Sequence, residues 1–410
     1  MPTWSSQTTS LVVIHGNIVV YAFSFWLTQP VLPFLLHELS ADKLLFSRFQ
    51  TFCSFLQLLG GPLAGRICDT FGFSVTLSAS QAAASLSYAL LAASFSVSTL
   101  FLSQLPTVFM HAMHAAQAAT TVLAPDNMRA TAMGRLSLSY GIGMVLGSYV
   151  GGIVSVAFST KHTAALAAVL SIAVLPVNWL VFQGMSRTTT LSAADSSTKP
   201  RATAIDVFKI VEVVRQPEVL NSLTIQVLVG LALSIHRSTF SEVLRQYLSL
   251  DPQGVGLIMS VSGVVTIVSN GVLLQMFLVQ WSERTVFLGA SSAIALSFAV
   301  YANLGFGPSG WWSLMALTVL LSGASAIAYT VLSSEMSKRA NPNNRATAIG
   351  LSHASRSGCG LIAPTLGTLL LHEYSFQAVG YFCCTMACLS VVYASLPAAH
   401  VSPDHSKKLK

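Results

Sequence analysis

The residues of this sequence that could do chemistry are polar and ionisable side chains set within long apolar segments. His111, His114 and Gln117 follow a three-residue spacing, which places them on one face of a helix. The histidine pair has two interpretations. It is either hydrogen-bonded in a helix core or a proton carrier, because the imidazole pKa lies near 6.5. The pair lacks the further ligands that a metal ion requires, so we predict no metal site.

Charges inside the expected membrane segments are the second group of candidates. A charge at bilayer depth costs about 2.5 to 3.5 kcal/mol, so it needs a function or a partner. Arg356 has no acidic residue at its depth and is predicted to bind substrate. Such a positive centre suits an anionic or lipid-like substrate. The candidates for the substrate or proton pathway are His111, His114, Gln117, His236, Arg237, Glu242, His353 and Arg356.

Motifs for enzyme chemistry are not found. Gly141-Ile142-Gly143, followed by Gly147, has the wrong spacing for a dinucleotide fingerprint and follows no strand. His372-Glu373 begins like a zinc-protease motif but has no second histidine at the required position. We therefore predict no enzyme activity and no cofactor.

The composition is that of a membrane protein, since 53% of the residues are hydrophobic and only 9% are charged. Segments of about 20 apolar residues span a bilayer as helices. The sequence therefore predicts an all-α membrane protein with twelve transmembrane helices. These are expected near 11–36, 47–66, 75–95, 99–123, 134–158, 163–182, 219–247, 254–279, 285–303, 311–334, 346–371 and 376–397.

A repeated phrase divides the chain into two halves. The sequence Arg-Ala-Thr-Ala at 129–132, followed by Gly134, recurs at 345–348, followed by Gly350. A repeat of this length indicates two homologous halves in the same orientation. The Ser/Thr-rich stretch between them lacks periodicity and reads as a linker. We predict six-helix bundles at 1–185 and 216–410, joined by a cytoplasmic linker at 186–215.

Lys and Arg set the orientation, because cytoplasmic loops retain positive charge. With both termini in the cytoplasm, fifteen Lys and Arg residues face inward and four face outward. The formal net charge of +7 follows from this topology, so nucleic-acid binding is not expected. Lys407 and Lys408 resemble a dilysine signal for the endoplasmic reticulum, or they are topology residues only. Endoplasmic reticulum and plasma membrane both remain open.

Small residues recur at fixed intervals within 134–158. This glycine ladder comprises Gly134, Gly143, Gly147, Ser148, Gly151 and Gly152, with Pro364 and Gly367 in the second half. It either only packs helices together or is a functional motif, since it resembles the antiporter motif of drug/proton exchangers in the major facilitator superfamily, with Ser148 where that motif has proline. Gly65, Asp69 and Gly72 stand at the spacing of the superfamily's cytoplasmic latch, although the basic residues that follow in the family are absent.

Further stretches, including Leu-Gln-Leu-Leu-Gly-Gly-Pro at 56–62 and Met-Gly-Arg-Leu at 133–136, are similar to organic-cation-transporter-like members of solute carrier family 22. This resemblance implies a protein embedded in the lipid bilayer that transports organic cations in exchange for protons. Transport would proceed by alternating access of the site to the two sides of the membrane. A carrier of anionic or lipid-like molecules and a non-transporting membrane scaffold are the alternatives. No feature of the sequence predicts an oligomeric state.

Overall fold

A computed structural model describes residues 4–39, 44–123, 129–182, 215–304, 310–339 and 345–396. The predicted linker and the dilysine tail lie outside these ranges. Within them every element of secondary structure is a helix. The helices are α1 (Trp4–Thr28), α2 (Leu32–Leu39), α3 (Leu45–Phe71), α4 (Phe73–Ala92), α5 (Val97–Gln104), η1 (Leu105–Phe109), α6 (Ala112–Leu123), α7 (Arg129–Ala157), α8 (Thr160–Ala173), α9 (Leu175–Phe182), α12 (Pro217–Leu248), α13 (Pro252–Val268), η3 (Ser269–Leu273), α14 (Leu274–Gln280), α15 (Glu283–Ala302), α16 (Gly310–Arg339), α17 (Arg345–Leu369), η5 (Leu370–Tyr374) and α18 (Phe376–Ser395).

These elements make twelve crossings in the described part of the chain, and all twelve coincide with the predicted segments to within several residues. Eight are long and apolar enough to be recognised as membrane spans by length and hydropathy alone. The other four are α3, α4, the α5–η1–α6 crossing and α17. α3 and α17 meet at the junction between the two halves, where polar side chains need not face lipid.

Several predicted helices are interrupted rather than continuous. The first crossing is α1 and α2, separated around Pro30, and the fourth is broken between η1 and α6 at Met110 and His111. α3 and α4 meet at Gly72, whose φ of +85° is a conformation that favours glycine. Local backbone chemistry therefore fixes where these crossings bend.

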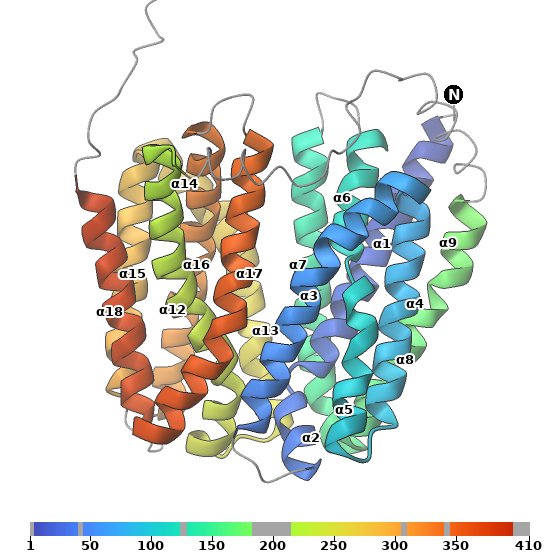
Figure 1. Ribbon diagram of the computed structural model, residues 1–410, viewed down its shortest axis with the longest axis horizontal. Helices are drawn as coiled ribbons and strands as arrows, with labels where there is room; N and C mark the ends of the chain where they lie inside the picture. The colour runs from blue at the N-terminus through green and yellow to red at the C-terminus, as the bar shows by residue number, and fades with distance from the viewer. Residues whose placement is uncertain are drawn as a thin grey trace, which may run out of the picture.

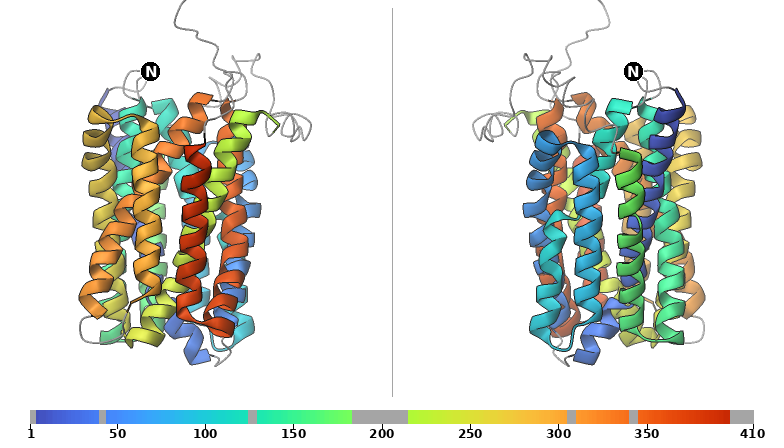
Figure 2. Two further views of the ribbon diagram at one scale, coloured as in Figure 1. Left: turned by 90° about the vertical axis from the view of Figure 1, so that its left-hand side faces the viewer. Right: turned by 90° about the vertical axis from the view of Figure 1, so that its right-hand side faces the viewer.

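The helices form two bundles that stand side by side (Figure 1). The N-terminal bundle contains α1 to α9 and the C-terminal bundle contains α12 to α18. The views from either side show the crossings running roughly parallel through the whole height of the molecule (Figure 2). We call the end where α1 begins the N-terminal end, and the other end the opposite end.

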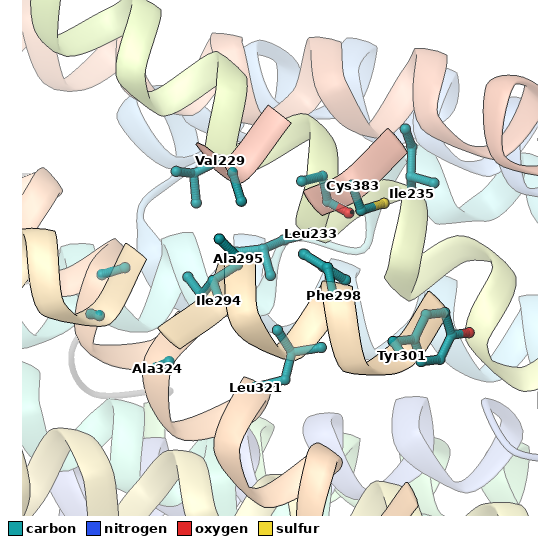
Figure 3. Close-up of a cluster of buried hydrophobic side chains, with 14 of the residues drawn as sticks. Val229, Leu233, Ile235, Ile294, Ala295, Phe298, Tyr301, Leu321, Ala324 and Cys383 are labelled. Carbon is teal, nitrogen blue, oxygen red and sulfur yellow. Dashed lines mark hydrogen bonds between the residues drawn. The ribbon is translucent and has the colours of Figure 1, made fainter. Parts of the chain in front are cut away.

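Each bundle has its own core. In the C-terminal bundle, Leu233, Phe298 and Leu321 belong to a single buried apolar cluster contributed by α12, α15 and α16 (Figure 3). The N-terminal bundle also buries a polar contact between its first and last crossings. Asn17 and Asn178 exchange two side-chain hydrogen bonds of 2.6 and 2.9 Å, although 161 residues separate them.

Two helix pairs make the most extensive contacts between the bundles, and we call them the α7–α13 seam and the α3–α17 seam; α2 also contacts α12. In the first, small residues bring the backbones together, and the Ser260 hydroxyl donates a hydrogen bond of 2.7 Å to the Val145 carbonyl. In the second, Thr51 and Thr365 meet through their hydroxyl groups at 3.2 Å. The α3–α17 contact lies toward the opposite end, and both helices separate toward the N-terminal end (Figure 1).

Candidate functional site

Two arginines of the C-terminal bundle come together where that bundle faces its partner. Arg237 lies on α12 and Arg356 on α17, and their guanidinium groups are close enough to interact electrostatically. Both side chains are exposed, although both belong to crossings of the membrane. Arg237 also lies within electrostatic range of the Tyr140 hydroxyl of α7, in the other bundle. We call Arg237, Arg356 and Tyr140 the arginine centre.

Aromatic rings surround this centre. The Arg356 guanidinium lies over the ring of Tyr329, 4.3 Å from its centroid. Across the junction, the Trp26 indole N–H donates a hydrogen bond of 3.2 Å to the Tyr140 phenolic oxygen. Because that oxygen already accepts from Trp26, the Tyr140 O–H remains a donor. The centre therefore offers cations and a hydroxyl donor beside flat apolar surfaces.

The arginine centre lacks a counter-charge in the part of the chain that the structure describes. Among the described residues, an ion pair joins Glu242 to Arg245. No described carboxylate pairs with Arg237 or Arg356. A cation–π contact such as that with Tyr329 contributes about 0.5 to 2 kcal/mol. One arginine at bilayer depth costs about 2.5 to 3.5 kcal/mol. The ring thus offsets part of the cost of one arginine, and a bound anion would offset more.

The fourth crossing is a broken helix whose freed polar groups are bound by its neighbours. Around the break, the Ser80 hydroxyl donates to the Phe109 carbonyl at 2.9 Å and accepts from the His111 backbone N–H at 3.2 Å. The Tyr21 hydroxyl donates to the Met110 carbonyl at 2.6 Å. Discontinuous helices of this kind occur at the binding sites of transporters.

The predicted residues on this crossing lie just beyond the break. The His111 and His114 rings stack with centroids 5.2 Å apart and planes inclined by 5°, as their three-residue spacing predicts. Gln117 is exposed one turn further along α6. Their role in a substrate or proton pathway stays a prediction.

The remaining pathway candidates do not join the arginine centre. His236 precedes Arg237 on α12 but turns into the C-terminal bundle, where its ring contacts Phe240, Phe298 and Tyr301. Glu242 accepts hydrogen bonds from Arg245 and Gln246. The His353 side chain lies outside the described residues. Adjacent residues of α12 thus serve a packed core and the face between the bundles.

The glycine ladder of α7 has two faces. A Cβ atom at Gly143, Gly147 or Gly151 would collide with the backbone of α1, at Val19, Phe23 and Leu27 respectively. A Cβ atom at Gly152 would lie 2.6 Å from the Pro252 carbonyl oxygen of α13.

Ser148 lies on the second face, since a Cβ atom at Gly256 of α13 would collide with its carbonyl oxygen. The ladder therefore packs α7 against its own bundle and against the other bundle at once. The surroundings of Gly134 are not described.

The counterparts of the ladder in the second half lie on α17, and Gly367 there approaches α12 of the same bundle. Pro364 is buried inside α17, and a Cβ atom at Gly367 would lie 2.7 Å from the Thr239 methyl carbon of α12. In the predicted latch, Gly72 supplies the turn between α3 and α4, whereas Gly65 faces open space. The Asp69 side chain is not described, so the latch function stays a prediction.

Sequence reasoning did not single out Trp26, Tyr140, Tyr329, Tyr21 or Ser80. Aromatic and hydroxyl residues are ordinary in membrane helices, and only the fold shows that these lie at the arginine centre or the helix break. Gly60 was also missed, although it belongs to the stretch at 56–62. A Cβ atom there would collide with the Val108 carbonyl and His111 Nε2, so glycine lets α3 approach the broken helix.

Comparisons with known proteins agree with this architecture. The model of the Major Facilitator Superfamily matches residues 16–225 and 222–410. Solute carrier family 22 member 18 of Mus musculus is 30% identical over 86% of this chain and 86% of its own length. Tetracycline resistance protein, class B, of Escherichia coli is 24% identical over 94% and 96% of the two chains. The solved structure of a point mutant of the nucleoside transporter NupG shares the fold, with a TM-score of 0.75 over 94% of this chain and 98% of that one, at 15% identity.

Proposed function

Because the chain belongs to the Major Facilitator Superfamily, we propose that it is a secondary-active transporter that carries an anionic substrate between its two helix bundles. The substrate would bind at the arginine centre and move by alternating access, in which the bundles rock about the bound molecule. Both termini would lie in the cytoplasm, in the endoplasmic reticulum or the plasma membrane. The six-helix bundles would extend over residues 1–185 and 216–410.

The unpaired arginine centre is the observation that carries the choice of an anion. Arg237 and Arg356 repel each other, so an anionic group between them gains attraction from both while relieving their repulsion. Guanidinium groups bind carboxylates and phosphates through parallel hydrogen bonds. Tyr140 would add a donor from the other bundle, so that substrate binding draws the two bundles together. The rings of Trp26 and Tyr329 would hold an apolar body attached to the anionic group.

Proton-coupled antiport of an organic cation is the second candidate. It is supported by the glycine ladder and by similarity to a tetracycline resistance protein. The arginine centre opposes it, because a cation placed there would face two positive charges without a described carboxylate. The third candidate is a membrane scaffold without transport. Such a protein would carry no probe across the membrane of proteoliposomes.

A matched set of probes tests the sign of the substrate. Benzenesulfonate and benzyltrimethylammonium have similar apolar bodies and opposite charges, so binding of each to the purified protein is measured by calorimetry. We expect benzenesulfonate to bind, and Arg237→Gln or Arg356→Gln to weaken it about ten- to hundredfold. That range corresponds to the loss of one hydrogen bond to a charged group. Arg215→Gln, at an exposed position before α12, is the control and should leave binding unchanged.

Three other results would decide against an anion carrier. Selective binding of benzyltrimethylammonium, unaffected by either arginine substitution, would support the cation antiporter. Binding without flux in proteoliposomes would support the scaffold. A fall in thermal stability with equal loss of both probes would show that the arginines are structural.

A further inference from the structure

Tyr140 and Arg356 occupy the same position in the two halves of the chain. The register that aligns the two Arg-Ala-Thr-Ala phrases also aligns Gly151 with Gly367 and Tyr140 with Arg356. In this superfamily the two halves are parallel repeats, related by an axis along the membrane normal. Equivalent residues of α7 and α17 therefore lie at the same depth on opposite sides of that axis. At this depth the N-terminal half carries a phenol where the C-terminal half carries a guanidinium.

The helices packed against α7 and α17 extend this correspondence. A Cβ atom at Gly151 would collide with the Leu27 carbonyl of α1. A Cβ atom at the equivalent Gly367 would lie 2.7 Å from the Thr239 methyl carbon and 3.4 Å from the Ser238 hydroxyl of α12. The turn of α1 at Leu27 and the turn of α12 at Ser238 and Thr239 therefore face equivalent glycines, so the two turns correspond.

At these corresponding places one half supplies aromatic rings and the other supplies two cations. Trp26 lies on the turn of α1, and Arg237 lies on the corresponding turn of α12. The Trp26 indole donates its 3.2 Å hydrogen bond to Tyr140, and Phe25 packs edge-on against the indole with ring centroids 5.8 Å apart. The C-terminal half instead places the Arg237 and Arg356 side chains here, and both are exposed. One side therefore suits an aromatic body and the other an anionic group.

The aromatic pair of Trp26 and Tyr140 is fixed to its bundle by the glycine ladder. Gly143, Gly147 and Gly151 bring the α7 backbone, which carries Tyr140, against the α1 backbone, which carries Trp26. Because backbone meets backbone at these glycines, neither helix can shift along the other without a clash. A ligand ring held by this pair therefore pulls on the N-terminal bundle as one body, while the charged group is held by the C-terminal bundle.

We infer that the substrate is an aryl anion, an aromatic ring bearing a carboxylate, sulfonate or phosphate, and that Trp26 and Tyr140 determine the specificity for the ring. This inference rests on the proposed anionic substrate. The arginines bind the charged group, whereas the ring connects that group to the N-terminal bundle. Aromatic contacts stabilise beyond the burial of apolar area, so the pair favours an aryl group over a saturated ring. Anions without a body should reach the arginines and be carried slowly.

Two sulfonates that differ only in the ring test this specificity. The affinities of benzenesulfonate and cyclohexanesulfonate for the purified protein are measured by calorimetry, and their ratio cancels the shared charged group. Comparing this ratio between wild type and Trp26→Leu cancels the different hydrophobicity of the two rings. We expect Trp26→Leu to lower the ratio about two- to tenfold against benzenesulfonate. It should still bind benzenesulfonate in preference to benzyltrimethylammonium. Trp179→Leu, at an exposed position of α9, is the matched control and should keep the wild-type ratio.

Flux in proteoliposomes separates the role of the ring from that of the charge. Methanesulfonate has the charged group without a ring, so at saturating concentration we expect it to be carried about tenfold more slowly than benzenesulfonate. Trp26→Leu should lower the maximal flux of benzenesulfonate. Arg356→Gln should instead raise the concentration needed for half-maximal flux of every sulfonate and leave the ratio of the two ring-bearing sulfonates unchanged.

An affinity ratio that is the same in Trp26→Leu as in wild type would overturn the aromatic specificity and leave the anion carrier in place. Equal maximal fluxes of methanesulfonate and benzenesulfonate in wild type would do the same without any variant. Should Trp26→Leu fail to fold, Tyr140→Phe carries the binding test, because it removes the oxygen that orients the indole and should lower the ratio as well. Wild-type protein that binds none of the sulfonates would instead overturn the proposed anion carrier.

Discussion

The two seams between the bundles are equivalent by the internal repeat, yet they are built differently. α7 and α17 begin with the same Arg-Ala-Thr-Ala phrase, and each packs against a helix of the other half. In the α7–α13 seam, Gly152 and Gly256 let backbone meet backbone. In the α3–α17 seam, a Cβ atom at Gly360 would lie 3.9 Å from the Ser54 hydroxyl, which is an ordinary contact.

This difference indicates that the two seams have different roles when the bundles move. A seam closed by backbone contacts cannot be opened and re-formed by rotating side chains, so it suits a pivot that stays together. A seam joined by threonine hydroxyls at one end can separate when the bundles rock. We therefore expect α7–α13 to act as the pivot and α3–α17 to act as the gate at the opposite end.

Locking the gate should have the largest effect. Thr51→Cys/Thr365→Cys places two thiols where hydroxyls lie 3.2 Å apart, so oxidation should join α3 to α17. Flux of the transported probe in proteoliposomes should stop and should return on reduction. Val145→Cys/Gly263→Cys, across the pivot, is the matched control, because a Cβ atom at Gly263 of α13 would lie 2.8 Å from the Val145 side chain. It should keep its flux when oxidised. Equal inhibition by both cross-links would show that both seams must open.

Filling the pivot should have the next largest effect, on stability. Gly256→Ala would drive a methyl group into the Ser148 carbonyl, and neither backbone can move without disturbing a whole helix. We expect a loss of about 2 to 3 kcal/mol in the free energy of unfolding, at the upper end for overpacked cores. Thermal unfolding in detergent measures it. Gly271→Ala is the control, since among the described residues no atom beyond its own helix turns lies within 4 Å of a Cβ there.

Removing one hydrogen bond from the pivot should have a smaller effect. Ser260→Ala deletes the donor to the Val145 carbonyl and should cost about 0.6 to 1.5 kcal/mol. Thr266→Ala is a suitable comparison, because among the described residues its hydroxyl bonds within α13, to the Ser262 carbonyl. If both variants lose equal stability, the Ser260 bond contributes nothing specific to the seam.

The smallest effect should come from the gate glycine. Gly360→Ala adds a methyl group where the nearest atom outside its own helix turns is the Ser54 hydroxyl, so we expect stability within about 0.5 kcal/mol of wild type. A loss as large as that of Gly256→Ala would remove the distinction between the two seams.

The fold could be predicted from the sequence because its signals are local and repeated. Apolar segments gave the twelve crossings, and the Arg-Ala-Thr-Ala phrases mark the starts of α7 and α17. The break at Met110 could not be predicted, because it depends on Ser80 and Tyr21 reaching across from other helices. A run of apolar residues reads as one helix until such partners are known.

Only part of the candidate site could be predicted, because the sequence shows which residues are costly in a membrane but not which way they face. Arg356 stands out because an arginine is costly in a membrane helix wherever it points. His236 and Arg237 could not be told apart, since their faces depend on which side of α12 turns toward Phe298 and Tyr301 of α15. Tyr140 and Trp26 carried no signal in the sequence. Their importance arises only when the two bundles are placed together.

The paired amides of Asn17 and Asn178 set an order for biosynthesis. The ribosome makes the first crossing long before the sixth, and domains fold as their segments emerge. Until α9 arrives, the Asn17 amide keeps its bond to the Val13 carbonyl of its own helix, but its side-chain oxygen enters the bilayer without the Asn178 donor. An unsatisfied polar group in lipid is costly, so the nascent first helix needs shelter at the insertion machinery or from a chaperone. We expect chains truncated before residue 178 to be retained there and degraded, while chains that include α9 are released.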